Sequence, residues 1–338
     1  MLTIIVGGFF GDEGKGKIAA YLALKDRPEI AVRTGSVNAG HTVIYGGRAW
    51  KLRVVPSAFV SKGTKLMLPA GYLLNPEVMW RELRGTGVEE RFFIDRDAGI
   101  IEEKHIQYER ENRHLREEIG STLQGVGAAM SDRVLRKLKL AKDMPGLSNM
   151  LTDVSEEIHE TLSAGGDVLA EGSQGTFLSL LHGTYPYVTS RDTTASAVAS
   201  EIGVGPKQVD EVILVFKAYV TRVGGGPLKN ELSGEETERR GWSEKAAVTG
   251  RARRAAPFDE DLALKAVKLN SATQIAITKI DVLFPEARGV TEWGELPQDA
   301  KEWILRIENF LKRPVTLIGT GPTPQETVDR RRELGIAD

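Results

Sequence analysis

The segment Leu2–Ile18, LTIIVGGFFGDEGKGKI, decides the fold because an apolar run leads directly into a glycine-rich loop. The run Leu2–Val6 predicts a short, buried strand of a parallel sheet. Apolar residues in Ile18–Leu24 recur at helical spacing, so the unit is predicted to be strand, loop and helix. The loop Gly11–Lys17 has a glycine, four residues and then Gly-Lys, which is most of a phosphate-binding P-loop.

Such a loop binds anions through its backbone. Its glycines let N–H groups curl around phosphate oxygens, and the helix that follows adds partial positive charge. The Ser or Thr that usually follows the pattern and ligates magnesium is replaced by Ile18. For this segment taken alone, a plain glycine-rich turn between strand and helix remains the alternative.

Further strands and helices alternate along the chain. Buried strands are predicted at 30–32, 167–170, 212–216, 274–277 and 315–318, and helices at 132–140, 148–162 and 299–312. Val43–Val55 alternates around Gly46-Gly47 and predicts a β-hairpin. We therefore expect an α/β fold with a mostly parallel, twisted sheet flanked by helices, similar to P-loop NTPases. Residues 1–338 are expected to form one domain, with a hairpin insertion at roughly 43–56 and a helical insertion at roughly 100–165.

Composition excludes several classes of function. The chain has 338 residues, 45 basic against 47 acidic, a net charge of -2, and no cysteine. That balance predicts neither a nucleic-acid partner nor an anionic membrane surface, and thiol chemistry, disulfides and cysteine metal sites are excluded. The apolar N-terminus lacks the basic flank of a signal peptide, and no run is long enough to span a bilayer, so a cytoplasmic location is expected.

Asp12 is unusual because it lies inside the phosphate loop, where a carboxylate would repel phosphates. It can be tolerated there if it holds a metal ion or takes a proton from a second substrate. His41 lies in the polar segment Asn38–Thr42, although a histidine taken alone is more often structural. His105, His114 and His159 lie in charge-rich helical stretches and are expected to be solvated.

Two other segments indicate a guanine nucleotide and an acidic substrate. Asp281, in Thr278–Asp281 at a predicted strand end, could accept hydrogen bonds from N1–H and the 2-amino group of guanine, a pair that adenine lacks. The loop Val248–Arg254 carries three arginines that could clamp carboxylates; alone, it could equally be a solvated surface loop. The polar run Glu171–Ser190 offers hydroxyl and amide partners for a base and a ribose phosphate.

Gly11–Lys17 followed by Asn38–Thr42, together with Glu171–Ser190, resembles the adenylosuccinate synthetases. The resemblance covers most of the chain, which is shorter than the familiar bacterial and eukaryotic members. It implies a ligase of AMP biosynthesis that converts IMP, L-aspartate and GTP to adenylosuccinate, GDP and phosphate through 6-phosphoryl-IMP. It also implies that Asp12 is the general base, that His41 is its acid partner, and that Asp12 and the carbonyl of Gly40 hold Mg²⁺.

The resemblance further implies a set of ligand contacts. Those to GTP are Gly11, Glu13, Gly14, Lys15, Gly16, Lys17, Gly40, Thr42, Arg253, Lys279, Asp281, Gly319, Thr320 and Gly321. Those to IMP are Asp12, Lys15, Asn38, His41, Thr122, Arg136, Gln174, Thr189 and Arg251. Those to L-aspartate are Val248, Thr249, Gly250, Arg251 and Arg253. Arg136 is implied to reach the neighbouring site of a homodimer.

Two other functions remain open from the residues. A P-loop ligase of the dethiobiotin synthetase type would use ATP and would not depend on IMP. A nucleotide-binding switch or partner-binding module would hydrolyse nucleotide slowly without a second substrate, but it has no need of the polar segment Glu171–Ser190. The run Lys217–Gly224 also resembles the family, and it receives no role from the sequence.

Overall fold

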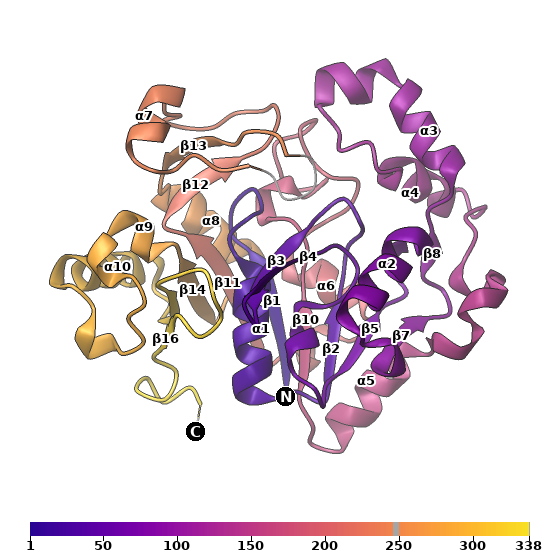
Figure 1. Ribbon diagram of the computed structural model, residues 1–338, viewed down its shortest axis with the longest axis horizontal. Helices are drawn as coiled ribbons and strands as arrows, with labels where there is room; N and C mark the ends of the chain where they lie inside the picture. The colour runs from indigo at the N-terminus through magenta and orange to yellow at the C-terminus, as the bar shows by residue number, and fades with distance from the viewer. Residues whose placement is uncertain (246–249, 338) are drawn as a thin grey trace.

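A central sheet organises the chain, with its strands in the order β16-β15-β14-β11-β1-β10-β2-β5-β7-β9 (Figure 1). The computed structural model describes residues 1–245 and 250–337. Neighbouring strands run parallel, except that β16 is antiparallel to β15. The predicted mostly parallel sheet is therefore confirmed. Its strands are β1 (Leu2–Gly7), β2 (Ile30–Arg33), β5 (Lys65–Leu68), β7 (Phe92–Asp95), β9 (Leu151–Thr152), β10 (Val168–Glu171), β11 (Glu211–Lys217), β14 (Gln274–Thr278), β15 (Val315–Gly319) and β16 (Thr327–Asp329).

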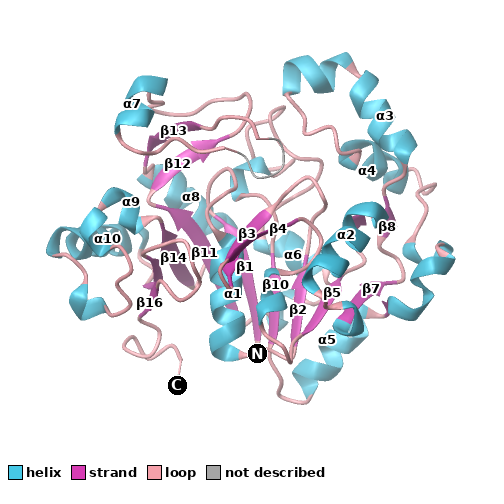
Figure 2. Cartoon of the chain, in the orientation of Figure 1, coloured by secondary structure: helices cyan, strands magenta, loops and turns pink. Residues whose placement is uncertain are grey.

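Helices cover both faces of this sheet, and Figure 2 shows them around the strands. Alternate residues of one strand enter different cores: Ile4 and Val6 pack with α8 and α10, whereas Ile5 packs with α1 and α2. No helix of the described residues is both long and apolar enough to cross a membrane. The helices are α1 (Lys15–Asp26), α2 (Pro76–Thr86), α3 (Glu103–Glu111), α4 (Val126–Val134), α5 (Val154–Ser163), α6 (Ala195–Glu201), α7 (Gly234–Arg239), α8 (Glu260–Asn270), α9 (Ile280–Leu283) and α10 (Gln298–Leu311).

Small strand pairs lie outside the main sheet. The predicted hairpin is confirmed as β3 (His41–Tyr45) and β4 (Arg48–Leu52), joined by two glycines with positive φ. A second antiparallel pair consists of β12 (Tyr219–Arg222) and β13 (Arg254–Pro257). In Figure 1 this pair and α7 stand at one side above the sheet, and α3 and α4 stand at the other. A short parallel pair joins β6 (Leu73–Leu74) and β8 (Gly99–Ile100).

The carboxyl ends of the parallel strands bring the predicted motifs to one edge of the sheet. The phosphate loop follows β1, the segment containing Asn38 follows β2, and the segment beginning at Gly172 follows β10. Lys279 follows β14, and Thr320 follows β15. Ligands of open α/β sheets bind at this edge, so the topology alone gathers the candidate site.

The solvated character expected for the charge-rich segment around His105 is wrong in part. His105 is buried; its Nε2 pairs with Asp132 at 3.2 Å, and its Nδ1 accepts from the backbone of Glu102. His114 is exposed, as expected, whereas His159 is half-buried. Two polar side chains of this charge-rich helix, His105 and Glu109, are therefore buried.

Candidate active site

The side chain of Glu13 stabilises the loop between β1 and α1 through hydrogen bonds within the loop. The buried carboxylate of Glu13 accepts hydrogen bonds from the backbone N–H groups of Phe9 at 3.0 Å and Gly11 at 2.8 Å. It also accepts from the Nζ of Lys15 at 2.8 Å. Thr278, at the end of β14, donates to the carbonyl of Glu13 at 2.6 Å, which ties the loop to a neighbouring strand. The side chain of Glu13 thus holds the loop, and only its backbone is left for a nucleotide.

Asp12 is held in a conformation that a non-glycine residue seldom adopts. Its φ is 63°, in the left-handed region, which costs about 1–3 kcal/mol and is typical of functional sites. Its side chain is 30% exposed, and its Oδ2 lies 2.5 Å from Nη1 of Arg253, whose side chain is only 6% exposed. The one carboxylate of the loop that can reach a ligand therefore faces a buried guanidinium.

His41 is oriented by a buried carboxylate. Its Nδ1 pairs with Glu171, whose two carboxylate oxygens also accept from the backbone N–H and the hydroxyl of Ser57, at 2.7 and 2.5 Å. Burial and the nearby Arg33 lower the pKa of His41 to about 4, so the imidazole is neutral at pH 7. Its Nδ1–H then donates to Glu171, and Nε2 is the ring nitrogen left for another group.

Close backbone packing brings His41 to the phosphate loop. A side chain at Gly16 would place its Cβ 2.8 Å from the Cβ of His41 and 3.0 Å from the hydroxyl of Ser57. Because real Cβ atoms essentially never approach so closely, only glycine allows α1 to pack against β3 here. Gly16 is therefore needed for the packing of α1 against β3 as well as for the phosphate loop.

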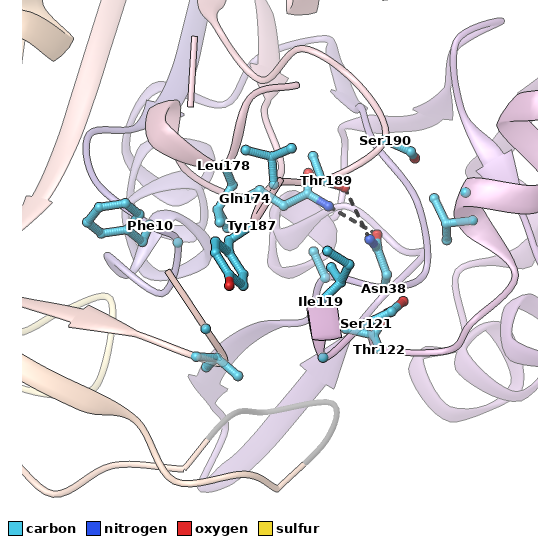
Figure 3. Close-up of a pocket in the computed structure, with 18 of the residues that line it drawn as sticks. Phe10, Asn38, Ile119, Ser121, Thr122, Gln174, Leu178, Tyr187, Thr189 and Ser190 are labelled. Atoms are coloured by element: carbon cyan, nitrogen blue, oxygen red, sulfur yellow. Dashed lines mark hydrogen bonds between the residues drawn. The ribbon is translucent and has the colours of Figure 1, made fainter. Parts of the chain in front are cut away.

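A cavity of about 400 Å³ lies beside these groups and falls within the range of small-ligand sites. Figure 3 shows Asn38 beside Gln174 and Thr189: Gln174 Nε2 donates to Asn38 Oδ1 at 3.0 Å, and Asn38 Nδ2 donates to Thr189 Oγ1 at 3.4 Å. Among the residues that the structure describes, the buried Oε1 of Gln174 has no hydrogen-bond partner, which leaves an acceptor for a ligand. The candidate site residues that line the cavity are Gly11, Asp12, Lys15, Asn38, Gly40, His41, Thr122, Gln174, Thr189 and Arg251.

The candidate guanine-binding residues lie on the other side of the phosphate loop, outside this cavity. Lys17 Nζ donates to the carbonyls of Gly321 at 2.7 Å and Glu326 at 2.6 Å, so the loop after β15 touches the phosphate loop. Asp281 is buried in the first turn of α9, a helix that begins directly after Lys279. The φ of Lys279 is 62°. Lys17 thus joins the phosphate loop to the segment Gly319–Gly321, and Asp281 follows the neighbouring strand β14.

Comparison with known proteins identifies the group to which this arrangement belongs. The family described as "Adenylosuccinate synthetase" matches residues 4–144 and 137–287 of the chain. The chain belongs to the adenylosuccinate synthetase family. It is therefore a GTP-dependent ligase, which sets aside the dethiobiotin synthetase type and the nucleotide switch.

Relatives of this synthetase family agree over almost the whole length. The chain is 52% identical over 336 residues to the adenylosuccinate synthetase of Methanocaldococcus jannaschii, covering 98% of this chain and 97% of the relative. It is 50% identical over 332 residues to that of Archaeoglobus fulgidus, covering 98% of each. The solved structure of the fully ligated adenylosuccinate synthetase of Plasmodium falciparum superposes with a TM-score of 0.89 at 25% identity, over 97% of this chain and 99% of that one.

Several candidate residues stand apart from the cavity of this synthetase. Arg136 has a φ of 61° and is exposed, and it does not line the cavity that the described residues form. Thr42 is exposed on β3. Val248 and Thr249 lie outside the described residues, so two of the residues expected to bind aspartate have no described position. Arg251 does reach the cavity, and it donates to the carbonyl of Gly120 at 2.8 Å.

Other residues of the site carried no clear signal in the sequence. Glu171 holds His41 from 130 positions away along the chain, and Ser57 holds Glu171 from 114 positions away. Glu171 begins the polar segment Glu171–Ser190 that resembles the family, but the sequence assigned it no role of its own. Glu244 lies near Arg253 and Lys279, and nothing in its sequence surroundings indicated this.

Proposed function

We propose that the chain joins IMP to L-aspartate at the cost of GTP, through an IMP that carries a phosphoryl group on O6. The proposal rests on one observation: residues of the phosphate-loop side and residues of the polar segment Glu171–Ser190 line the same cavity. Asp12, Lys15 and His41, from the phosphate-loop side, line the same space as Gln174 and Thr189. A site that phosphorylates a bound nucleotide needs this combination, whereas a nucleotide switch needs only the loop.

In the first step, Asp12 removes the N1 proton of IMP and makes O6 nucleophilic. O6 then attacks the γ-phosphorus, the bond between that phosphorus and the β,γ-bridging oxygen breaks, and GDP leaves with the electron pair. Lys15 and the loop N–H groups stabilise the charge on the transferring group. His41 contacts that group through Nε2, because Glu171 engages Nδ1.

In the second step, the neutral amino group of L-aspartate attacks C6, the O6–C6 bond breaks, and phosphate leaves with the electron pair and takes the proton that the attacking nitrogen loses. Arg251 and Arg253 hold the aspartate carboxylates, with Thr249 as a further contact. The Nε of Arg253 is buried and has no acceptor within residues 1–245 and 250–337. A substrate carboxylate would satisfy this donor, and pairs of this kind are commonly bidentate.

For the nucleotide, Asp281 selects guanine by accepting from N1–H and the 2-amino group. Lys279 lays its methylene stem along the base, and Gly319–Gly321 close over it. The hydrogen bonds from Lys17 to Gly321 and Glu326 support this arrangement, because they join the phosphate end of the nucleotide site to its guanine end.

The donor set suits magnesium, which proteins usually hold through one or two carboxylates together with substrate phosphates. Asp12 would supply the carboxylate and Gly40 a backbone carbonyl, and both residues line the cavity. Bound there, Mg²⁺ would neutralise charge on the β- and γ-phosphates.

We also infer a cytoplasmic homodimer. Exposed apolar side chains flank Arg136, with Val134 70% and Leu135 61% exposed, and a partner subunit would cover them. Arg136 would then contact IMP in the neighbouring site. The lack of cysteine suits a reducing compartment.

One experiment tests the reaction: incubation with GTP, IMP and L-aspartate, omitting each in turn, with adenylosuccinate detected by mass. Product should require all three, and ATP should not replace GTP. Asp12→Ala should abolish IMP-dependent GTP consumption, since positioned proton transfer is worth about 10²- to 10⁴-fold. Product formed without IMP, or substantial turnover by the variant, would contradict the assignment.

A further inference from the structure

The end of β11 holds a fully buried ammonium group that the proposed reaction does not use. The side chain of Lys217 is only 2% exposed, and its Nζ donates to Thr221 Oγ1 at 2.6 Å and to Glu244 Oε2 at 2.9 Å. Burial lowers the pKa of Lys217, and Glu244 opposes that effect. A buried cation requires a fixed counter-charge, so Lys217 pins the carboxylate of Glu244 to the end of the central sheet.

Glu244 stands among three cations. Besides Lys217, its Oε2 lies 3.6 Å from Nη1 of Arg253, and its Oε1 lies 3.6 Å from Nζ of Lys279. Burial alone would raise the pKa of Glu244, but Lys217 and Lys279 keep that pKa at about 2. The carboxylate is therefore charged at every working pH, and it sits between a residue of the proposed aspartate site and a residue of the proposed guanine site.

The backbone around Glu244 is held firmly. Tyr219 donates its hydroxyl to Glu244 Oε1 at 2.6 Å, and the Tyr219 ring stacks on Trp242 with centroids 4.5 Å apart. The N–H of Arg253 donates to the carbonyl of Glu244 at 3.0 Å, so the two residues are also neighbours through the main chain. These contacts fix the carboxylate in place rather than leaving it on a free loop.

Arg253 is placed between two carboxylates. Its Nη1 lies 2.5 Å from Asp12 Oδ2 and 3.6 Å from Glu244 Oε2. When Asp12 contacts a substrate, as proposed above, its ion pair with Arg253 must loosen. Glu244 then offers the buried guanidinium a second partner, so that it stays over the site and is not left unpaired.

We propose that Glu244 is a positioning residue that holds Arg253 above Asp12 and Lys279 beside the guanine site, and so couples aspartate binding to nucleotide binding. This inference rests on the proposed function, since it takes from there the roles of Arg253 and Lys279. It also gives a role to the first residues of the family-like run Lys217–Gly224, because Lys217 and Tyr219 hold the carboxylate of Glu244 in place.

The test is Glu244→Gln in the full chain, because glutamine keeps the volume and can still accept from Tyr219, but it lacks the charge. We expect the KM for L-aspartate and the KM for GTP each to rise about tenfold or more, while the KM for IMP stays within about twofold; hydrogen bonds to charged groups commonly have effects of this size. Calorimetric titration of GDP should show the same loss without turnover. Glu231→Gln, which breaks the neighbouring exposed pair with Arg254, is the matched control and should leave all three constants unchanged.

A merely structural role for Glu244 predicts a different result. It would lower the melting temperature and raise all three KM values together, including that for IMP, and this outcome would overturn the inference. Constants equal to those of Glu231→Gln would overturn it too. If Glu244→Gln does not fold, Tyr219→Phe is the second variant, because it removes only the hydroxyl that donates to Glu244. It should raise the KM for L-aspartate and the KM for GTP. If both KM values are unchanged in Tyr219→Phe, the inference is refuted.

The wild-type chain separates this inference from the proposed function. If wild type makes no adenylosuccinate from IMP, GTP and L-aspartate, the proposed function fails. If wild type does so and Glu244→Gln behaves like the control, only the role of Glu244 fails.

Discussion

The Nζ of Lys17, in the first turn of α1, donates a hydrogen bond of 2.7 Å to the carbonyl of Gly321, 304 positions away. A second bond of 2.6 Å goes to the carbonyl of Glu326. The phosphate-loop lysine is thus held by the segment proposed to close over guanine. Burial is the main cause that lowers the pKa of Lys17 to about 7, although Asp281 and Glu326 oppose it.

Nucleotide binding should take up a proton at Lys17. With a pKa of about 7 in the free chain, the amine is mostly neutral at pH 8, and bound phosphates favour its charged form. Binding of GDP at pH 8 should therefore consume protons, and at pH 6 it should not. Calorimetric titrations in two buffers of different ionisation enthalpy measure the proton count. Lys17→Arg, which stays charged, should lose the uptake; equal counts in both proteins would contradict the assignment.

Glu171→Gln should lower kcat by about 10²-fold with little change in the KM for IMP, because the carboxylate holds the tautomer and direction of His41. Steady-state kinetics at pH 7 separate the two constants. Ser57→Ala removes one of the two hydrogen bonds from Ser57 and should cause a smaller loss. Full activity of a well-folded Glu171→Gln would mean that His41 needs no orientation.

Asp281→Asn should erase the preference for GTP over ITP. The carboxylate can accept from N1–H and from the 2-amino group that ITP lacks, whereas an asparagine side chain offers one acceptor oxygen and a donor. The ratio of kcat/KM for the two nucleotides measures the change. Glu286→Gln, on the exposed turn after α9, is the control. A preference that survives in Asp281→Asn would place guanine recognition elsewhere.

The sequence predicted the parts of the fold that have a local cause. The apolar run at Leu2–Val6, the glycine loop and the hairpin around Gly46-Gly47 each follow from neighbouring residues, and each is found where it was expected. The strands β5 and β7 were not predicted: each has only four residues, and the residues around them show no clear alternation.

The site could be predicted only where a motif carries its own chemistry. Asp12 and His41 belong to such motifs. Glu244 lies in no such motif, and Glu171 begins the family-like segment Glu171–Ser190 but received no role from it. Their roles depend on contacts with Lys217, 27 positions away from Glu244, and with His41, 130 positions away from Glu171. The burial of His105 could not be predicted either, because its partner Asp132 lies in the next helix. Long-range pairing decides such residues, and no local pattern records it.

Glu109→Ala should destabilise the chain and weaken IMP binding together. The buried carboxylate of Glu109 accepts from the backbone N–H groups of Gly125 at 2.8 Å and Gly127 at 2.7 Å, at the start of α4. Leaving such donors buried and unpaired costs about 1–3 kcal/mol, so the melting temperature should fall by a few degrees. Because Thr122 lies three residues before Gly125, the KM for IMP should rise as well. Glu111→Ala, an exposed change on the same helix α3, should do neither. Equal melting temperatures for the two variants would show that α4 does not need this carboxylate.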